Sequence, residues 1–530
     1  MRTVLALAAG LLAAAPGAFA ANAQQLIDRS IQALGGSEAL SGLKRVTLSG
    51  VARFWEPEQS HVPSGEMRFG AVSRFTQTRD TPAGLARTDW VRDYEYPARR
   101  TYTYSEVVTP DAGYVKGIDA TTRTKQSQSN DPPQHAMSGV RLAAAQRELA
   151  RSSPTLLLDL KANPKAVGTL PDQTVDGMRY TALRYQWKDQ RFTLLLDPAT
   201  HLPARIRTRD ADAIQGDSDY DLVLSNWREV GGAKLAHGQD YLLNGQTVVQ
   251  TRITQATANP GVDASTFAIP EPIKAAAAKP ASGSVPYQWV LRRQHLGVYL
   301  DSDGIGYDTG SGSGLKLTDI APGISLTQGG THNSMIVELD KYLVVFDAPI
   351  GESQAKWTVE AARARYPGKP IRYLVLTHHH MDHASGTRTF VAMEGATLVV
   401  GKGARQHFQR VLAAPHRVDD DLLQRKPRRT EIVEVDGKWT VGDGRRQVGA
   451  YAVDNPHAEA MLIGYLPDAR LGFVTDLWSP GRDALGAKPT AGQTALVAAV
   501  RKYGIDPERF AGGHGSTAPY GDLAKIADAK

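Results

Sequence analysis

Residues 371–383 read IRYLVLTHHHMDH, and their pattern indicates both the architecture and the chemistry of the second half of the chain. Its mostly apolar first part, residues 371–376, predicts a buried strand. Four histidines and one aspartate follow directly in residues 378–383. Because so many polar rings are poor material for a hydrophobic core, the stretch predicts a strand that ends in a ligand-binding loop.

The spacing of these polar residues indicates two adjacent half-sites for a divalent cation. Since side chains alternate along an extended segment, His378 and His380 point to the same side. The turn that follows directs Asp382 and His383 toward a neighbouring point. Imidazole nitrogens and carboxylate oxygens suit zinc, and a catalytic zinc keeps one position open for water. The same ligands accept iron or manganese, so the sequence leaves the identity of the metal open.

Three further residues of metal-binding type follow predicted strands later in the chain. His457 comes after the apolar segment 448–453, Asp476 after the segment 471–474, and His514 within the sequence Ala-Gly-Gly-His-Gly. Small or turn-forming neighbours surround each of them and allow a close approach to a metal. Strand and helix patterns alternate between these segments, which indicates an α/β architecture.

The order of these residues resembles the metallo-β-lactamase superfamily over about residues 315–530. The shared features are the HxHxDH motif and the three later ligands. The resemblance implies a C-terminal αββα sandwich with a site for two zinc ions. It assigns His378, His380 and His457 to one ion, Asp382, His383 and His514 to the other, and Asp476 to a bridging position.

Such a dinuclear site implies a hydrolytic mechanism. Two dications about 3.5 to 4 Å apart can share a hydroxide nucleophile and polarise a carbonyl or phosphoryl oxygen. Asp382 is the expected catalytic residue, because a carboxylate there can orient the hydroxide and transfer a proton to the leaving group. Asp347 follows the apolar segment 341–346 and is expected to support a ligand from behind.

The bridging residue narrows the choice of reaction. Zinc β-lactamases of the superfamily generally have cysteine or serine in place of Asp476, so β-lactamase activity is a minor alternative. Glyoxalase-II-like thioesterases, lactonases and phosphodiesterases keep the aspartate. We therefore expect a metallohydrolase that cleaves a thioester, lactone, ester or phosphodiester of a small-molecule substrate. Two alternatives stay open: an iron-dependent oxidoreductase similar to persulfide dioxygenases, and an envelope lipid-binding module with an auxiliary metal site.

Other histidines near the motif are expected to take no part in metal binding. His379 lies inside the motif, and alternation directs it away from the ligands. His332 is expected in a surface loop, with a place at the rim of the site as the alternative. His407 and His416 belong to a polar insertion, residues 404–430, and are expected at the surface.

Residues 22–275 predict a different fold. Several segments are rich in β-branched and aromatic residues, and turn signals such as Asn244-Gly245 separate them, as is typical of antiparallel hairpins. One Ala-rich helical stretch, residues 142–150, interrupts this pattern. We expect a mostly antiparallel, open β-barrel-like domain. This part resembles periplasmic lipoprotein-carrier-like β domains.

The whole chain of 530 residues is therefore expected to be a two-domain protein that combines an α+β and an α/β part. Residues 276–314 are expected to contain a linker and, after it, a Gly-rich loop. Alanine, lysine, proline, serine and glycine dominate the start of this segment, and they leave little to bury in a core.

The N-terminus is typical of a secretory signal peptide over residues 1–20. Arg2 precedes an apolar run, residues 4–15, and Ala18-Phe19-Ala20 fits a cleavage site. The run is shorter than the about 20 residues that span a bilayer, so no stable membrane anchor is expected. We expect a bacterial protein in the periplasm or the medium.

Composition excludes several classes of protein. The chain has no cysteine, so neither disulfides nor thiolate chemistry can contribute. Its net charge of +6 is small for this length and spread along the chain, so no nucleic-acid partner is expected. The sequence leaves the oligomeric state open.

Overall fold

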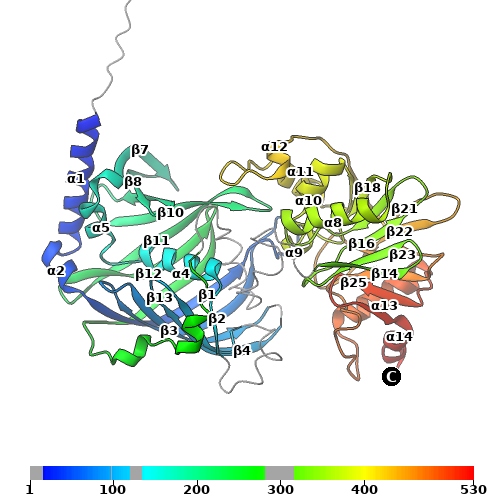
Figure 1. Cartoon of the computed structure of the whole chain (residues 1–530), viewed down its shortest axis with the longest axis horizontal. Helices are drawn as coiled ribbons and strands as arrows, with labels where there is room; N and C mark the ends of the chain where they lie inside the picture. Colours follow the sequence, from blue (N-terminus) through cyan, green and yellow to red (C-terminus); the bar gives the residue numbers. More distant parts are fainter. Residues whose placement is uncertain (1–15, 97, 120–133, 281–314, 530) are drawn as a thin grey trace, which may run out of the picture.

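The computed structural model describes residues 16–96, 98–119, 134–280 and 315–529. Two domains lie side by side, an N-terminal one built on a large antiparallel sheet and a C-terminal one built on two mixed sheets (Figure 1). The predicted two-domain fold class is therefore confirmed. Most of the expected linker, residues 281–314, lies outside the described residues.

The N-terminal sheet has thirteen strands, and each is antiparallel to its neighbours. Its order is β6-β5-β4-β3-β2-β1-β13-β12-β11-β10-β9-β8-β7, so within the described residues the sheet is open. The strands are β1 Arg45–Glu56, β2 Arg68–Asp80, β3 Leu85–Tyr94, β4 Arg100–Val108, β5 Gly113–Gly117, β6 Gln134–Ala136, β7 Val167–Val175, β8 Met178–Trp187, β9 Gln190–Leu196, β10 Pro203–Asp212, β11 Gly216–Val230, β12 Ala233–Leu243 and β13 Gln246–Ala258.

Local sequence explains this sheet well. Side chains of β1 alternate between buried and more exposed positions, as a strand with one face on a core requires. The β12–β13 hairpin turns at Asn244 and Gly245, whose φ angles of 48° and 84° are the positive values that a two-residue hairpin turn demands. The predicted Asn-Gly hairpin is thus confirmed.

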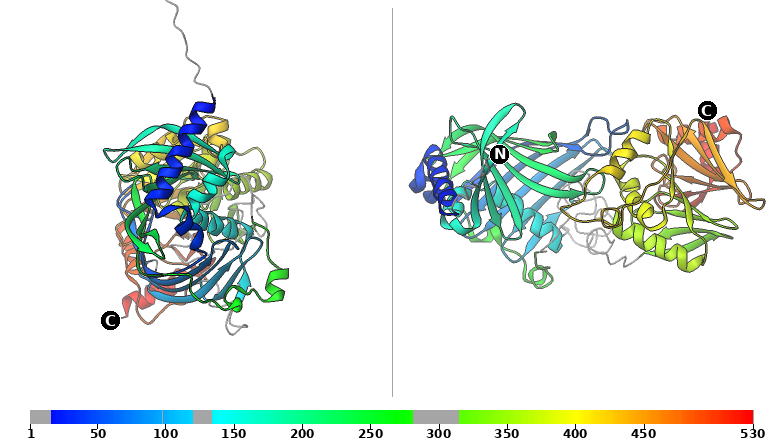
Figure 2. Two further views of the ribbon diagram at one scale, coloured as in Figure 1. Left: turned by 90° about the vertical axis from the view of Figure 1, so that its left-hand side faces the viewer. Right: turned by 90° about the horizontal axis from the view of Figure 1, so that it is seen from above.

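Helices cover the inner face of the sheet in two places (Figure 2). One group packs Ile27, Ile31 and Leu157 against the strands, and α4 packs Leu142 beside Phe54. The helices of this domain are α1 Pro16–Ala33, α2 Gly36–Gly42, α4 Gly139–Arg151, α5 Leu156–Ala162 and α6 Glu271–Ala275, with short 3-10 turns at Pro164–Ala166 and Ala264–Phe267.

Helix α1 begins at Pro16 and therefore includes the end of the predicted signal peptide, whose first fifteen residues lie outside the described part. No helix in the described ranges is both long and apolar enough to cross a membrane.

The C-terminal domain is a four-layer αββα sandwich. Its first sheet has the order β14-β15-β16-β17-β18-β19-β20 and its second the order β21-β22-β23-β24-β25-β26. Apolar side chains fill the space between the sheets, where the rings of Phe346 and Phe473 lie 5.5 Å apart. Two further apolar clusters attach the outer helices to the two sheets.

The bounds of these elements follow the alternation seen in the sequence. The strands are β14 Lys316–Ala321, β15 Ile324–Gln328, β16 Met335–Glu338, β17 Leu343–Phe346, β18 Ile371–Val375, β19 Thr397–Gly401, β20 Ile432–Val435, β21 Lys438–Gly442, β22 Gln447–Val453, β23 Met461–Leu466, β24 Leu471–Val474, β25 Arg509–Gly512 and β26 Thr517–Pro519. The helices are α8 Glu352–Arg365, α9 Met381–Ala384, α10 Thr387–Glu394, α11 Arg405–Ala413, α12 Leu422–Arg425, α13 Ala491–Tyr503 and α14 Tyr520–Asp528.

Candidate metal centre

Loops that follow the strands of both sheets bring the seven predicted ligands to one edge of the sandwich. His378 and His380 lie between β18 and α9, and the first turn of α9 carries Asp382 and His383. The other three residues follow β22, β24 and β25: His457, Asp476 and His514. The structure thus gathers residues from four separate parts of the chain.

The first group of donors consists of His378, His380, His457 and Asp476, and their ligand atoms lie within 4.8 Å of one another. Three buried ring nitrogens of this group, His378 Nε2, His380 Nδ1 and His457 Nε2, make no hydrogen bond among the described residues. Leaving a buried nitrogen without a partner costs free energy. A cation held by these three lone pairs accounts for the arrangement.

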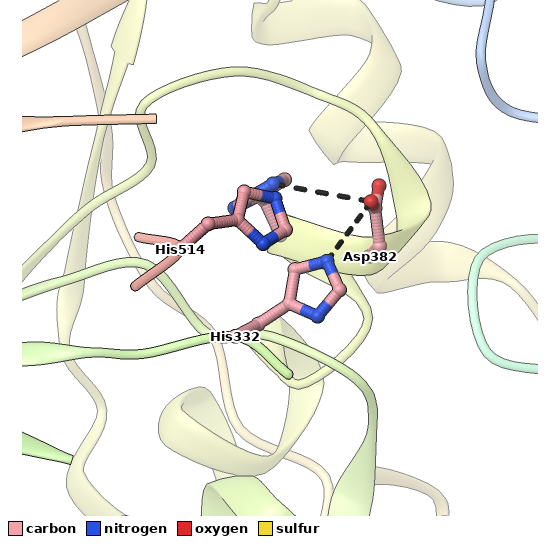
Figure 3. Close-up of side chains that lie close together, drawn as sticks. His332, Asp382 and His514 are labelled. Carbon is pink, nitrogen blue, oxygen red and sulfur yellow. Dashed lines mark hydrogen bonds and ion pairs between the residues drawn. The ribbon is translucent and has the colours of Figure 1, made fainter. Parts of the chain in front are cut away.

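The second group consists of His332, Asp382, His383 and His514, whose ligand atoms also lie within 4.8 Å of one another. His383 Nε2 is buried and makes no hydrogen bond within the part of the chain that the structure describes. His332 Nε2 donates a hydrogen bond to Asp382 Oδ2 over 3.1 Å, and the ring of His514 lies beside that of His332, with the two centroids 4.2 Å apart (Figure 3).

Asp476 connects the two groups. Its Oδ2 lies 3.2 Å from both His378 Nε2 and His457 Nε2 and 3.1 Å from His383 Nε2. Its Oδ1 lies 2.9 Å from His514 Nε2. One carboxylate therefore faces donors of both groups, as a residue that bridges two cations must.

His383 and His514 each use their Nδ1 atom for a hydrogen bond outside the site, which leaves the Nε2 atom available to a metal ion. His383 Nδ1 donates to Asp347 Oδ2 over 3.2 Å, and His514 Nδ1 donates to the carbonyl oxygen of Thr331 over 3.0 Å. Asp347 also accepts from the backbone N–H and the hydroxyl of Thr377, at 2.7 and 2.9 Å. These bonds place Asp347 where the sequence expects a supporting carboxylate, in a position to orient the ring of a ligand.

Close packing at the site requires a glycine at position 513. A Cβ atom added to Gly513 would lie 2.1 Å from Thr475 Cγ2 and 3.5 Å from His383 Cε1. A larger residue there would displace the loop that carries His514. The small neighbours noted in the sequence are therefore needed for the approach of the loops.

Charges of opposite sign dominate the electrostatics. Burial alone would raise the pKa of Asp476, but the imidazoles of His383, His457 and His514 lower it well below its usual range. The pKa of Asp382 is likewise lowered, because His383 and His332 outweigh the effect of burial. Burial lowers the pKa of His378 to about 4. Both carboxylates are therefore ionised at neutral pH, and His378 is neutral, which is the form that binds a metal.

His332 corrects the sequence prediction. It was expected in a surface loop, but it is buried and belongs to the second group. Gln354 donates to its carbonyl oxygen and thereby attaches the β15–β16 connection to α8. Burial and the neighbouring His514 lower the pKa of His332 to about 3, so its ring is neutral.

His407 and His416 are buried as well, so their predicted surface position was wrong. The insertion 404–430 packs between the two domains, where Ser64 Oγ lies 2.8 Å from His407 Nδ1 and the backbone N–H of Asp217 donates to the Pro415 carbonyl. His379 belongs to neither group of donors, as expected, and its Nε2 donates to the carbonyl oxygen of Ser60.

The N-terminal domain contributes residues to this site that the sequence did not predict. The β1–β2 loop, residues 57–67, reaches the metal-binding motif. Gln59 Nε2 donates to Asp382 Oδ1 over 2.7 Å, and the Ser60 carbonyl accepts from His380 Nε2 over 2.8 Å. Just beyond the loop, Arg68 Nη2 donates to the carbonyl oxygen of His457 over 2.9 Å. No motif in the loop points to these contacts.

Comparison with known proteins agrees with this geometry. Residues 327–517 match the family model of the metallo-beta-lactamase superfamily. The C-terminal domain belongs to this superfamily. Its αββα layers and donor groups are the features that the sequence resemblance implied. No curated protein matches the chain significantly.

Solved structures of similar fold cover only part of the chain. A flavodiiron core from Synechocystis sp. is 17% identical with a TM-score of 0.32, and the match covers 40% of this chain and 59% of that one. A metallo-beta-lactamase from Pontibacter korlensis is 17% identical with a TM-score of 0.30, over 40% of this chain and 95% of that one. An inverting sec-alkylsulfatase from Pseudomonas sp. is 17% identical with a TM-score of 0.31, and the match covers 46% of this chain and 43% of that one.

Proposed function

We propose that this protein is an exported dinuclear-zinc hydrolase that cleaves an ester-type bond in a thioester, lactone, ester or phosphodiester. The superfamily consists mostly of hydrolases, although some members are oxidoreductases. The observation that carries the proposal is the position of Asp476, whose two oxygens face donors of both groups. Such a residue can neutralise part of the repulsion between two cations.

Two zinc ions, when bound, would supply Lewis acidity and a hydroxide near neutral pH. His378, His380 and His457 would hold one ion, and Asp382, His383 and His514 would hold the other. Asp382 is ionised and accepts a hydrogen bond from His332, so it can orient a nucleophilic water and carry a proton to the leaving group.

Turnover of a small chromogenic panel tests the proposal. The panel contains a phosphodiester, a thioester, a lactone and a cephalosporin, each offered to the zinc-loaded chain. We expect turnover of one ester-type class that Asp382→Ala abolishes. Asp522→Asn, a surface carboxylate of α14, is the matched control and keeps full activity. No turnover of any class by a chain with two bound zinc ions would reject the hydrolase and favour a redox reaction.

A second candidate function concerns the N-terminal domain. A cavity of ≈ 190 Å³ lies inside the sheet between strands and α4, and its lining includes Phe54, Trp90, Tyr220 and Tyr241. Arg79, Glu106, Arg141 and Glu148 line it as well, so the cavity suits an apolar ligand that carries a polar group. Mass spectrometry of an extract of the purified full chain tests this function: a stoichiometric lipid supports it, and an empty cavity rejects it.

A further inference from the structure

The β1–β2 loop contacts both groups of metal donors at once. Gln59 contacts Asp382 in the second group, and Ser60 contacts His380 in the first. Gln59 is only 2% exposed, and Ser60 is 5% exposed. The backbone N–H of Met381 donates to the carbonyl oxygen of Glu58, which holds the loop against the start of α9. Gln59 and Ser60 are therefore enclosed between the domains.

The orientation of the Gln59 amide follows from its two partners. An ionised carboxylate can only accept hydrogen bonds, so the Gln59 atom that faces Asp382 must be the amide nitrogen. The amide oxygen then points the other way and accepts from the hydroxyl of Tyr96 over 2.5 Å. Burial and the charge of Asp382 raise the pKa of Tyr96 well above its usual value, so the hydroxyl keeps its proton.

This chain of hydrogen bonds assigns different tasks to the two oxygens of Asp382. The Gln59 amide occupies Oδ1, and Oδ2 remains on the side of His332 and His383, at 3.1 and 3.9 Å. A carboxylate whose outer oxygen is fixed cannot rotate freely, so Oδ2 is held toward the second group of donors. Outer partners of this kind raise the affinity of a site for its metal.

The first group receives parallel support. The Ser60 carbonyl accepts from His380 Nε2 and leaves Nδ1 as the free donor of that ring. Arg68 lies over the ring of Tyr96, 4.6 Å from its centroid, and donates to the His457 carbonyl. Tyr96 therefore packs between the residues that reach the two groups.

We propose that the N-terminal domain completes the metal centre, with Gln59 as a positioning residue of Asp382 and Tyr96 as the residue that orients the Gln59 amide. The proposal rests on the proposed function for its effect on turnover, but its effect on zinc binding is independent of the substrate. The isolated C-terminal fold thus contains the ligands but lacks a part of their support.

Zinc affinity of the full chain, measured by competition with a chromogenic chelator, tests this proposal in four variants. Gln59→Leu removes the amide at similar size, and Gln59→Glu places a like charge against Asp382. We expect each substitution to lower the affinity for one of the two zinc ions by about 10- to 100-fold. Tyr96→Phe leaves the amide but frees its rotation, and we expect a loss of about 2- to 10-fold.

Asp217→Ala is the matched control for the contact between the domains. Asp217 accepts from the backbone N–H groups of Arg417 and Val418 and touches no metal donor. We expect its zinc affinity to stay within about twofold of the unaltered chain, and the unfolding midpoints of all variants show whether each is folded.

Two results would overturn the proposal. One is wild-type affinity for both zinc ions in Gln59→Leu and Gln59→Glu. The other is an equal loss of zinc affinity in Asp217→Ala. That result would mean that zinc affinity depends on the docking of the two domains and not on Gln59. Kinetics give a second readout: Gln59→Leu is expected to lower kcat with little change in KM. If the unaltered chain binds two zinc ions but shows no turnover, the hydrolase fails while the zinc measurement still decides the role of Gln59.

Discussion

Two loops meet at the metal centre, and a sequence motif indicates the role of only one of them. The motif loop, residues 377–383, carries four of the donor residues within a few positions. The β1–β2 loop, residues 57–67, reads as an ordinary turn-rich connection. Metal ligands can therefore be recognised from a local sequence motif. The residues that orient the ligands can come from any part of the chain that folds beside them.

The largest effect is expected from the residue that joins the two groups. Asp476→Ala removes the only acidic side chain that faces donors of both groups in the described part of the chain. The Lewis acids contribute several kcal/mol to such reactions. We therefore expect turnover to fall by about a thousandfold or more. Elemental analysis after dialysis should find fewer than two zinc ions per chain.

Asp476→Asn keeps the volume of the side chain and serves as the control for packing. We expect it to lose zinc as Asp476→Ala does, because the charge is what two cations require. Full zinc content in both variants would mean that Asp476 does not bridge.

A support from within the C-terminal domain allows a direct comparison with Gln59. Asp347→Ala removes the carboxylate that accepts from His383 and Thr377. We expect zinc affinity to fall by about 10- to 100-fold, as for Gln59→Leu. We also expect a loss of about 1 to 3 kcal/mol in unfolding free energy, because the buried donors of Thr377 lose their acceptor. Chelator competition and urea denaturation measure the two effects; an unchanged zinc affinity would confine Asp347 to a structural role.

A contact of the insertion 404–430 is expected to affect the stability of the fold but not its zinc affinity. Arg388 in α10 pairs with both oxygens of Asp421, at 2.5 and 3.0 Å. We expect Arg388→Met to cost about 3 kcal/mol at pH 7, since it leaves a largely buried carboxylate without its partner. Zinc affinity should remain within about twofold, because neither residue contacts a donor.

The same pair predicts a dependence of stability on pH. Burial would raise the pKa of Asp421, but the hydrogen bond from Arg388 and the neighbouring His416 lower it below its usual value. A lowered carboxyl pKa stabilises the fold above the unfolded value of about 3.9 and loses this contribution as the pH falls through the folded value. The difference between Arg388→Met and the unaltered chain should therefore shrink below pH 4 in denaturation experiments. A difference that grows in acid would argue against this pair.

The smallest effect is expected at the far end of the β1–β2 loop. Ser64→Ala removes the contact with His407 Nδ1 but leaves Gln59 and Ser60 in place. We expect a loss of less than about 1 kcal/mol in unfolding free energy and an unchanged zinc affinity. A large loss of zinc would show that the whole loop acts as a unit and that Gln59 has no special part.

The predictable part of the structure is the part with a local pattern. Alternation along β18 and the turn after it place His378 and His380 as expected. The Asn244-Gly245 turn likewise specifies its hairpin through positive φ angles.

Other features depend on distant partners. Strands β2 and β3 carry several charged residues among their apolar ones. One of these, Arg92, is fully buried against the ring of Phe54, at 4.4 Å. The polar insertion around His407 suggested a surface position, but it is buried at the contact between the domains. Gln59 gave no signal, since an amide acquires its role only when Asp382 lies beside it.

Anomalous diffraction from crystals of the zinc-loaded full chain would show whether the N-terminal domain completes a dinuclear metal centre. We expect two zinc peaks about 3.5 to 4 Å apart, with Asp476 between them. We also expect the Gln59 amide to donate to the Asp382 oxygen that does not bind metal. A single peak, or a Gln59 side chain turned away from Asp382 when both ions are bound, would contradict a metal centre completed by the N-terminal domain.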